Sequence, residues 1–144
     1  MSSDDLAFLL GRLKRIYIMA HGALALCGLT LLLSPPPELT GRDIDGALSL
    51  YSALSLGLCF LGMVLHYQLL RPARVAKAHQ ASAAVFSGYL IAWLCFALAG
   101  GIGLMIGLSL AGAEHAWPVL TLAALSLLSH PPLRGKLKRA MGVR

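Results

Sequence analysis

Four long apolar runs, separated by short polar or basic stretches, organise the whole chain. They cover residues 16–34, 47–70, 82–110 and 116–130. The first three reach or exceed the roughly 20 residues that a helix needs to cross a bilayer. The fourth has 15 residues. At ~1.5 Å per residue it would be about 22 Å long, so it fits a short crossing, an interfacial helix or a buried one.

The basic residues distinguish between three and four crossings. Eleven of the 12 lie before the first run, between the second and third, or after the fourth: Arg12, Lys14, Arg15, Arg71, Arg74, Lys77, Arg134, Lys136, Lys138, Arg139 and Arg144. Four crossings place these three regions on one side of the membrane, whereas three would separate the tail from the rest. Because loops rich in Lys and Arg stay cytoplasmic, we predict an all-α integral membrane protein with four transmembrane helices, a single domain and both termini in the cytoplasm.

Composition and charge agree with a membrane location. The chain is 58% hydrophobic and 12% charged, which is more apolar than a soluble domain of this size can bury. We expect no cleaved signal peptide, because polar MSSDD and basic GRLKR precede the first run. The net charge of +6 is not interleaved with aromatic residues, so we predict no nucleic-acid binding. Anionic lipid headgroups of a bacterial-type inner membrane are the expected partner of the basic loops.

Acidic residues are missing from the apolar runs. The six acids of the chain all lie outside them: Asp4, Asp5, Glu38, Asp43, Asp45 and Glu114. No carboxylate is therefore expected inside the membrane to bind a cation or relay a proton. This argues against a self-sufficient proton-coupled transporter. It also leaves no buried acid for a Ser-His-acid triad, so no catalytic residue is predicted and a non-enzymatic role is favoured.

Four of the five histidines are expected near the cytoplasmic side: His21, His66, His79 and His130. The simplest interpretation is that they bond to headgroups and helix ends. Imidazole also suits proton relay and axial haem ligation. An alternative function is therefore a small membrane-embedded redox protein that binds haem b or a quinone through His21 and His66. Apart from that alternative, no cofactor is predicted.

Cysteines and small residues are the other recurring types. Cys27, Cys59 and Cys95 fall at similar depth on three helices, where thiols could gather around Cu(I). Without a CxxC pair we favour packing and predict no metal site. Small residues recur every four positions, which lets helices approach closely. They are Ser49, Ala53 and Gly57 in the second run and Gly103 and Gly107 in the third, and they fit packing within the chain or against another subunit.

The loop RPARVAKAHQAS, residues 71–82, resembles a motif of a known family. Its matching positions are Pro72, Lys77, His79, Ala81, Ser82 and Gly88. They are similar to the loop of the small G subunit of multisubunit monovalent cation/proton antiporters of the Mrp, Mnh or Pha type. The tail LLSHPPLRGKLKRA also looks like the end of that subunit. Ala73 replaces the expected acid, and the first helix is additional, so the resemblance covers residues 47–144.

The resemblance implies an accessory subunit that packs against other membrane subunits and does not itself carry the ion. Pro72, Lys77, His79 and Ser82 would then be partner contacts, with His21 and His66 as further polar candidates. Our leading prediction is a non-catalytic small subunit or assembly partner of a membrane transport complex. The redox protein and a stand-alone membrane protein of unknown ligand are the alternatives.

Overall fold

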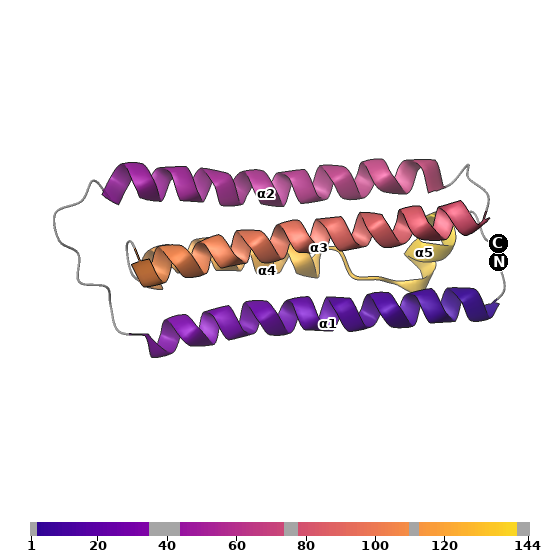
Figure 1. Ribbon diagram of the computed structural model, residues 1–144, viewed down its shortest axis with the longest axis horizontal. Coiled ribbons are helices and arrows are strands. Elements are labelled where there is room, and N and C mark those ends of the chain that lie inside the picture. Colours follow the sequence, from indigo (N-terminus) through magenta and orange to yellow (C-terminus); the bar gives the residue numbers. More distant parts are fainter. Residues whose placement is uncertain (1–2, 35–43, 74–77, 110–112, 141–144) are drawn as a thin grey trace.

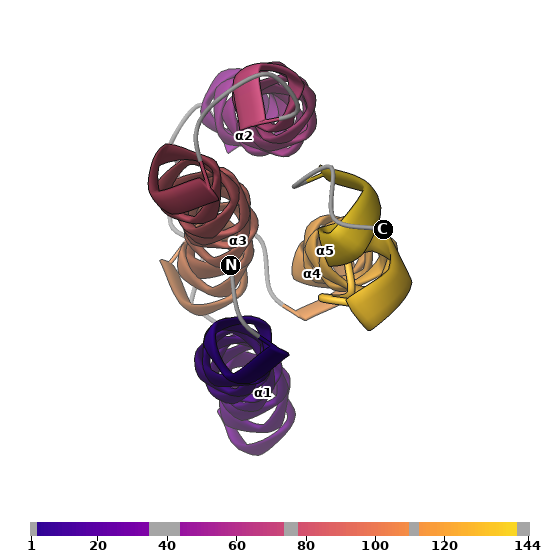
Figure 2. The same ribbon diagram turned by 90° about the vertical axis from the view of Figure 1, so that its right-hand side faces the viewer.

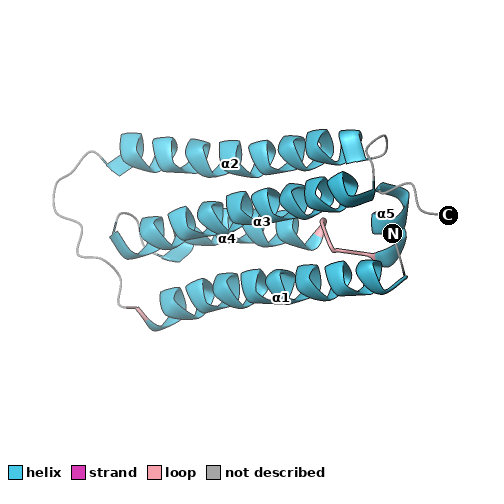
Figure 3. Cartoon of the chain, turned by 45° about the vertical axis from the view of Figure 1, so that its right-hand side comes forward, coloured by secondary structure: helices cyan, strands magenta, loops and turns pink. Residues whose placement is uncertain are grey.

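The chain folds into helices only. The computed structural model describes residues 3–34, 44–73, 78–109 and 113–140. Within these ranges there are five helices and no strand (Figure 3). The helices are α1 (Ser3–Leu33), α2 (Ile44–Ala73), α3 (Ala78–Ser109), α4 (Ala113–Leu128) and α5 (Arg134–Ala140). The predicted all-α class is confirmed.

Three of the helices are long and apolar enough to cross a membrane. Their candidate spans are Asp5–Leu33, Gly46–Leu70 and Ala81–Ser109. Large apolar side chains such as Ile18 and Phe60 point outward from α1 and α2. These features indicate a membrane-embedded protein, because lipid solvates apolar surface that water does not. Helix α4 has 16 residues and a length of about 24 Å, which is less than the ~30 Å hydrocarbon core.

Helix α3 is the centre of the bundle. The long helices run antiparallel in sequence order, and α4 returns beside α3 (Figure 1). Seen from one end, α1 and α2 lie on opposite sides of α3 (Figure 2). Half of the most apolar stretch of α3 is buried (50%), against 11% in α1 and 17% in α2. The core therefore forms along α3, with α1, α2 and α4 packed around it.

Glycines of α3 let its neighbours come close. A Cβ at Gly103 would lie 3.2 Å from Cγ1 of Val119 on α4. A Cβ at Gly107 would lie 3.0 Å from Cβ of Ala116 and would overlap the side chain of Leu31 on α1. Both glycines are thus packed inside this chain, against α4 and α1.

The small residues of α2 have a different environment. Ser49, Ala53 and Gly57 are exposed, and a Cβ at Gly57 would meet nothing within 4 Å. Helix α2 approaches α3 through Gly62 instead, where a Cβ would lie 2.9 Å from Cε1 of Phe96. The row of Ser49, Ala53 and Gly57 therefore has no packing partner in the part of the chain that the structure describes.

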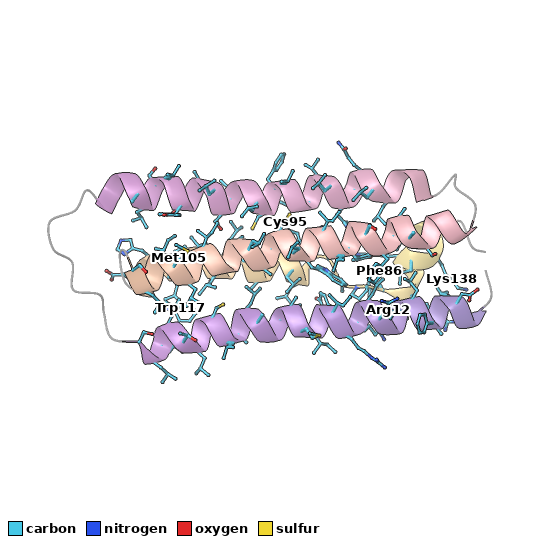
Figure 4. All side chains as sticks on the ribbon, in the orientation of Figure 1. Arg12, Phe86, Cys95, Met105, Trp117 and Lys138 are labelled. Atoms are coloured by element: carbon cyan, nitrogen blue, oxygen red, sulfur yellow. The ribbon has the colours of Figure 1, made fainter. Side chains whose placement is uncertain are left out.

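The two ends of the bundle differ in charge. We call the end at which α1 begins and α5 lies the basic end (Figure 1). The described basic side chains all belong to the first half of α1 or to α5: Arg12, Lys14, Arg15, Arg134, Lys136, Lys138 and Arg139. Figure 4 shows Arg12 and Lys138 toward this end and Trp117 toward the other. The guanidinium of Arg12 lies 5.2 Å from the ring centroid of Phe86, a cation–π contact that joins α1 to α3.

Candidate functional site

The end of α4 shapes a site at the basic end. Two prolines, Pro131 and Pro132, follow α4, and proline offers no N–H to continue a helix. The N–H of Ser129, the first residue after α4, bonds to the carbonyl of Leu125 over 3.0 Å. Helix α4 has 16 residues against 32 in α3. Because α4 ends early, α5 instead of α4 contacts α2 and α3 near the basic end (Figure 1).

A cavity of about 650 Å³ lies between α2, α3 and the segment from Ser129 to Arg139. Its volume is in the range of small-molecule sites. One part of its wall is polar or charged and the other is apolar or aromatic. The lining residues are His66, Gln68, Ser129, His130, Lys136 and Arg139, together with Met63, Tyr67, Leu70 and Tyr89.

His130 is held at both its ring and its backbone. Its Nδ1 lies 2.9 Å from the carbonyl oxygen of Ser126 and 2.7 Å from Oγ of Ser129. The Ser129 hydroxyl donates to the same carbonyl over 2.8 Å. This network assigns the proton to Nδ1 and leaves Nε2 available. The indole N–H of Trp93 donates to the carbonyl of His130 over 3.2 Å.

His66 brings a second imidazole from α2. Its ring meets that of His130 with centroids 4.8 Å apart and that of Tyr89 with centroids 4.6 Å apart, both edge-on. The residue is 5% exposed, and its Nδ1 is buried without a hydrogen-bond partner among the described residues. A buried polar atom left unpaired is costly, so this nitrogen is a candidate ligand contact.

Helix α5 supplies the fixed charges of the cavity. Lys136 and Arg139 are three positions apart, which places them on one face of the helix. Leu137, which is fully buried, anchors α5 to the bundle. The acidic side chains that the structure describes are Asp5 and Glu114, and neither lines the cavity. The described lining is therefore positive, without a compensating carboxylate.

His21 does not join this site. Its Nδ1–H donates to the carbonyl of Tyr17 over 2.9 Å, and its buried Nε2 has no described partner. His21 lines a separate apolar groove of about 590 Å³ between α1 and α4. A series of ring contacts connects the two regions, with Tyr17 5.4 Å from Trp93 and Trp93 5.2 Å from Tyr89. His21 and His66 are at opposite ends of this series, so they do not face one another across a shared space.

The cysteines are packed as free thiols. Cys59 and Cys95 are buried, and Cys27 is partly buried. In the described part of the chain, no three His, Cys, Asp or Glu side chains are grouped to hold a metal ion. We find no arrangement there for a thiolate copper site.

The loop that carries the family resemblance is mostly undescribed. Lys77 lies outside the described residues, as do the side chains of Pro72 and His79. Ser82 is half-buried near the start of α3. The sequence places His130 with His66 among the histidines near the cytoplasmic side, but it does not predict that their rings meet.

These features define an α-helical, membrane-embedded protein with a histidine-lined cavity at its basic end. No family model, curated protein or solved structure matches the chain. Its function is therefore inferred from its own residues.

Proposed function

We propose that the protein is a non-catalytic subunit or assembly partner of a membrane transport complex. The observation that carries this proposal is the row of Ser49, Ala53 and Gly57 on α2, which is exposed and unpacked within the described chain. At Gly103 and Gly107 of α3, by contrast, side chains of α1 and α4 occupy the space beside the glycine. Small residues at this spacing let another helix approach closely, so the α2 row fits a helix of a partner subunit.

The distribution of acids supports an accessory role. All six acids lie outside the four apolar runs. An ion path through a membrane needs polar or ionisable groups that face the interior of the bundle. The path in such a complex would then belong to the partner subunits. The resemblance of residues 71–82 to the small antiporter subunit favours a cation/proton antiporter of a bacterial-type inner membrane.

Four crossings with both termini in the cytoplasm belong to the same proposal. Helix α4 runs back along α3 toward the basic end, and basic α5 follows it (Figure 1). This arrangement fits a fourth crossing that returns the tail to the side of the N-terminal basic residues. Thinning of the bilayer around α4 would accommodate its short length. Anionic headgroups would then surround the basic end.

A native gel of the tagged chain, extracted from its own membrane in a mild detergent, tests the proposal. Gly57→Leu places bulk on the α2 row, whereas Gly22→Leu places the same bulk on an exposed glycine of α1 that also has no neighbour within 4 Å. We expect the parent and Gly22→Leu to migrate in a complex well above the 15.2 kDa chain. The Gly57→Leu chain should no longer migrate in that complex, whereas the thermal stability of the chain itself should be unchanged.

The outcomes separate the parts of the proposal. A parent chain that migrates alone, or a complex that Gly57→Leu leaves intact, would refute docking through α2. Mass spectrometry of the isolated complex tests the antiporter part: large antiporter subunits are expected, and a complex without them would remove that part.

A further inference from the structure

The cavity at the basic end has the charge of an anion site. Lys136 and Arg139 line it from one face of α5, and no described carboxylate lies in its wall. A guanidinium offers paired N–H donors that match the oxygens of a phosphate, and an ammonium adds a compact charge. These two side chains are exposed, so a ligand can reach them without opening the bundle.

The wall behind these charges contains two buried histidines, one of which has a ring nitrogen without a described hydrogen-bond partner. His66 is 5% exposed and His130 is 8% exposed, and both line the cavity. Nδ1 of His66 has no described partner, and it can donate to a ligand in the tautomer that carries the ring proton there. His130 carries its ring proton on Nδ1, so its Nε2 accepts a hydrogen bond and does not donate to an anion. The ammonium, the guanidinium and the His66 ring together offer a multi-oxygen anion more donors than a carboxylate can use.

The volume and the apolar lining of the cavity indicate that its ligand has an organic portion. About 650 Å³ exceeds the space that a bare ion needs, and Met63, Leu70 and Tyr89 make one wall apolar. We propose that this cavity binds a phosphate ester, with its phosphate held by Lys136, Arg139 and Nδ1 of His66 and its organic portion against the apolar wall. The ester can be the headgroup of an anionic lipid or a soluble phosphate ester. The inference does not depend on the chain being a subunit.

Trp93 provides an optical probe, because its indole bonds to the carbonyl of His130 in the cavity wall. Trp117→Phe removes the other of the two tryptophans. The purified Trp117→Phe protein is titrated in detergent with dihexanoyl phosphatidylglycerol and, separately, with glycerol 3-phosphate. Dihexanoyl phosphatidylcholine, whose choline cation offsets the charge of its phosphate, serves as the ligand control. Calorimetry under the same conditions detects binding that leaves Trp93 fluorescence unchanged.

Two double variants in this background separate a site from general charge. Lys136→Gln with Arg139→Gln removes the cavity charges, and Lys14→Gln with Arg15→Gln removes two exposed charges of α1 that do not line the cavity. We expect saturable binding that the first pair weakens about tenfold or more and the second leaves within about twofold. His66→Phe, which keeps a ring but removes the unpaired nitrogen, should also weaken binding.

Each outcome decides the proposal. Binding of phosphatidylglycerol alone identifies a headgroup site, and binding of glycerol 3-phosphate as well identifies a site for soluble esters. Equal losses in the two double variants would mean diffuse charge attraction and would overturn the proposal. Equal binding of phosphatidylcholine would mean that binding does not depend on the charge of the ligand, and would overturn it as well. The absence of any heat or fluorescence change with either anionic ligand would overturn it as well.

Discussion

The indole N–H of Trp93 donates to the backbone carbonyl of His130 over 3.2 Å, although the two residues are 37 positions apart. His130 precedes Pro131 at the end of α4, where carbonyls lose their partners within the helix. The bond therefore satisfies a carbonyl that the end of the helix leaves open. It also joins α3 to the segment that forms one wall of the cavity.

Replacing Trp93 by phenylalanine tests the importance of this bond. Trp93→Phe should destabilise the fold by about 1–3 kcal/mol, because a buried carbonyl is left unpaired and ring volume is lost. Thermal unfolding in detergent measures the effect. Trp117→Phe changes an exposed tryptophan in the same way and should leave the unfolding temperature nearly unchanged. Equal unfolding temperatures for the two variants would show that the bond contributes nothing.

The glycines of α3 should be intolerant of bulk. Gly103→Leu and Gly107→Leu would each force a side chain into Val119 or Ala116, so we expect a loss of about 1–3 kcal/mol or more from overpacking. Gly101 lies on the same helix with nothing within 4 Å, and Gly101→Leu is the matched control. Thermal unfolding of the purified variants measures the difference. If Gly101→Leu is as destabilising as the others, helix propensity and not packing is responsible.

Reporter tags at residues 1 and 144 test the topology. We expect both tags to report the cytoplasm, because 11 of the 12 basic residues fall on one side under four crossings. A phosphatase and a fluorescent protein fused in turn at each position give opposite signals on the two sides. A periplasmic signal from residue 144 would refute four crossings and make α4 a surface or interfacial helix.

The long helices could be predicted because a long apolar run needs lipid or the protein core around it, and in a membrane it forms a helix. The start of α1 differs from the expectation, since the helix begins at Ser3 and the apolar run at residue 16. Leu6, Leu9 and Leu13 recur at helical spacing and are buried. Arg12, Lys14 and Arg15 interrupt this segment, so it is not part of a continuous apolar run. Lys and Arg are nevertheless good helix formers, and the helix continues through them.

The site could not be predicted, because it depends on which helix faces meet. A haem or quinone site on His21 and His66 requires the two side chains to face one another, but α3 lies between α1 and α2. His66 instead meets His130, whose position depends on the turn at Pro131 and on the burial of Leu137. Pro131 and Pro132 mark a stop soon after α4. These prolines carry no information about how α5 packs against α2 and α3.

Photo-crosslinking from the α2 row tests the central claim of a partner subunit most directly. A benzophenone amino acid at Ala53 lies on that row, and one at Leu26 lies on an exposed position of α1 as the control. After irradiation in the native membrane, we predict that Ala53 gives a discrete protein adduct that Gly57→Leu abolishes, while Leu26 does not give that adduct. No protein adduct from Ala53, or the same adduct from both positions, would contradict the account.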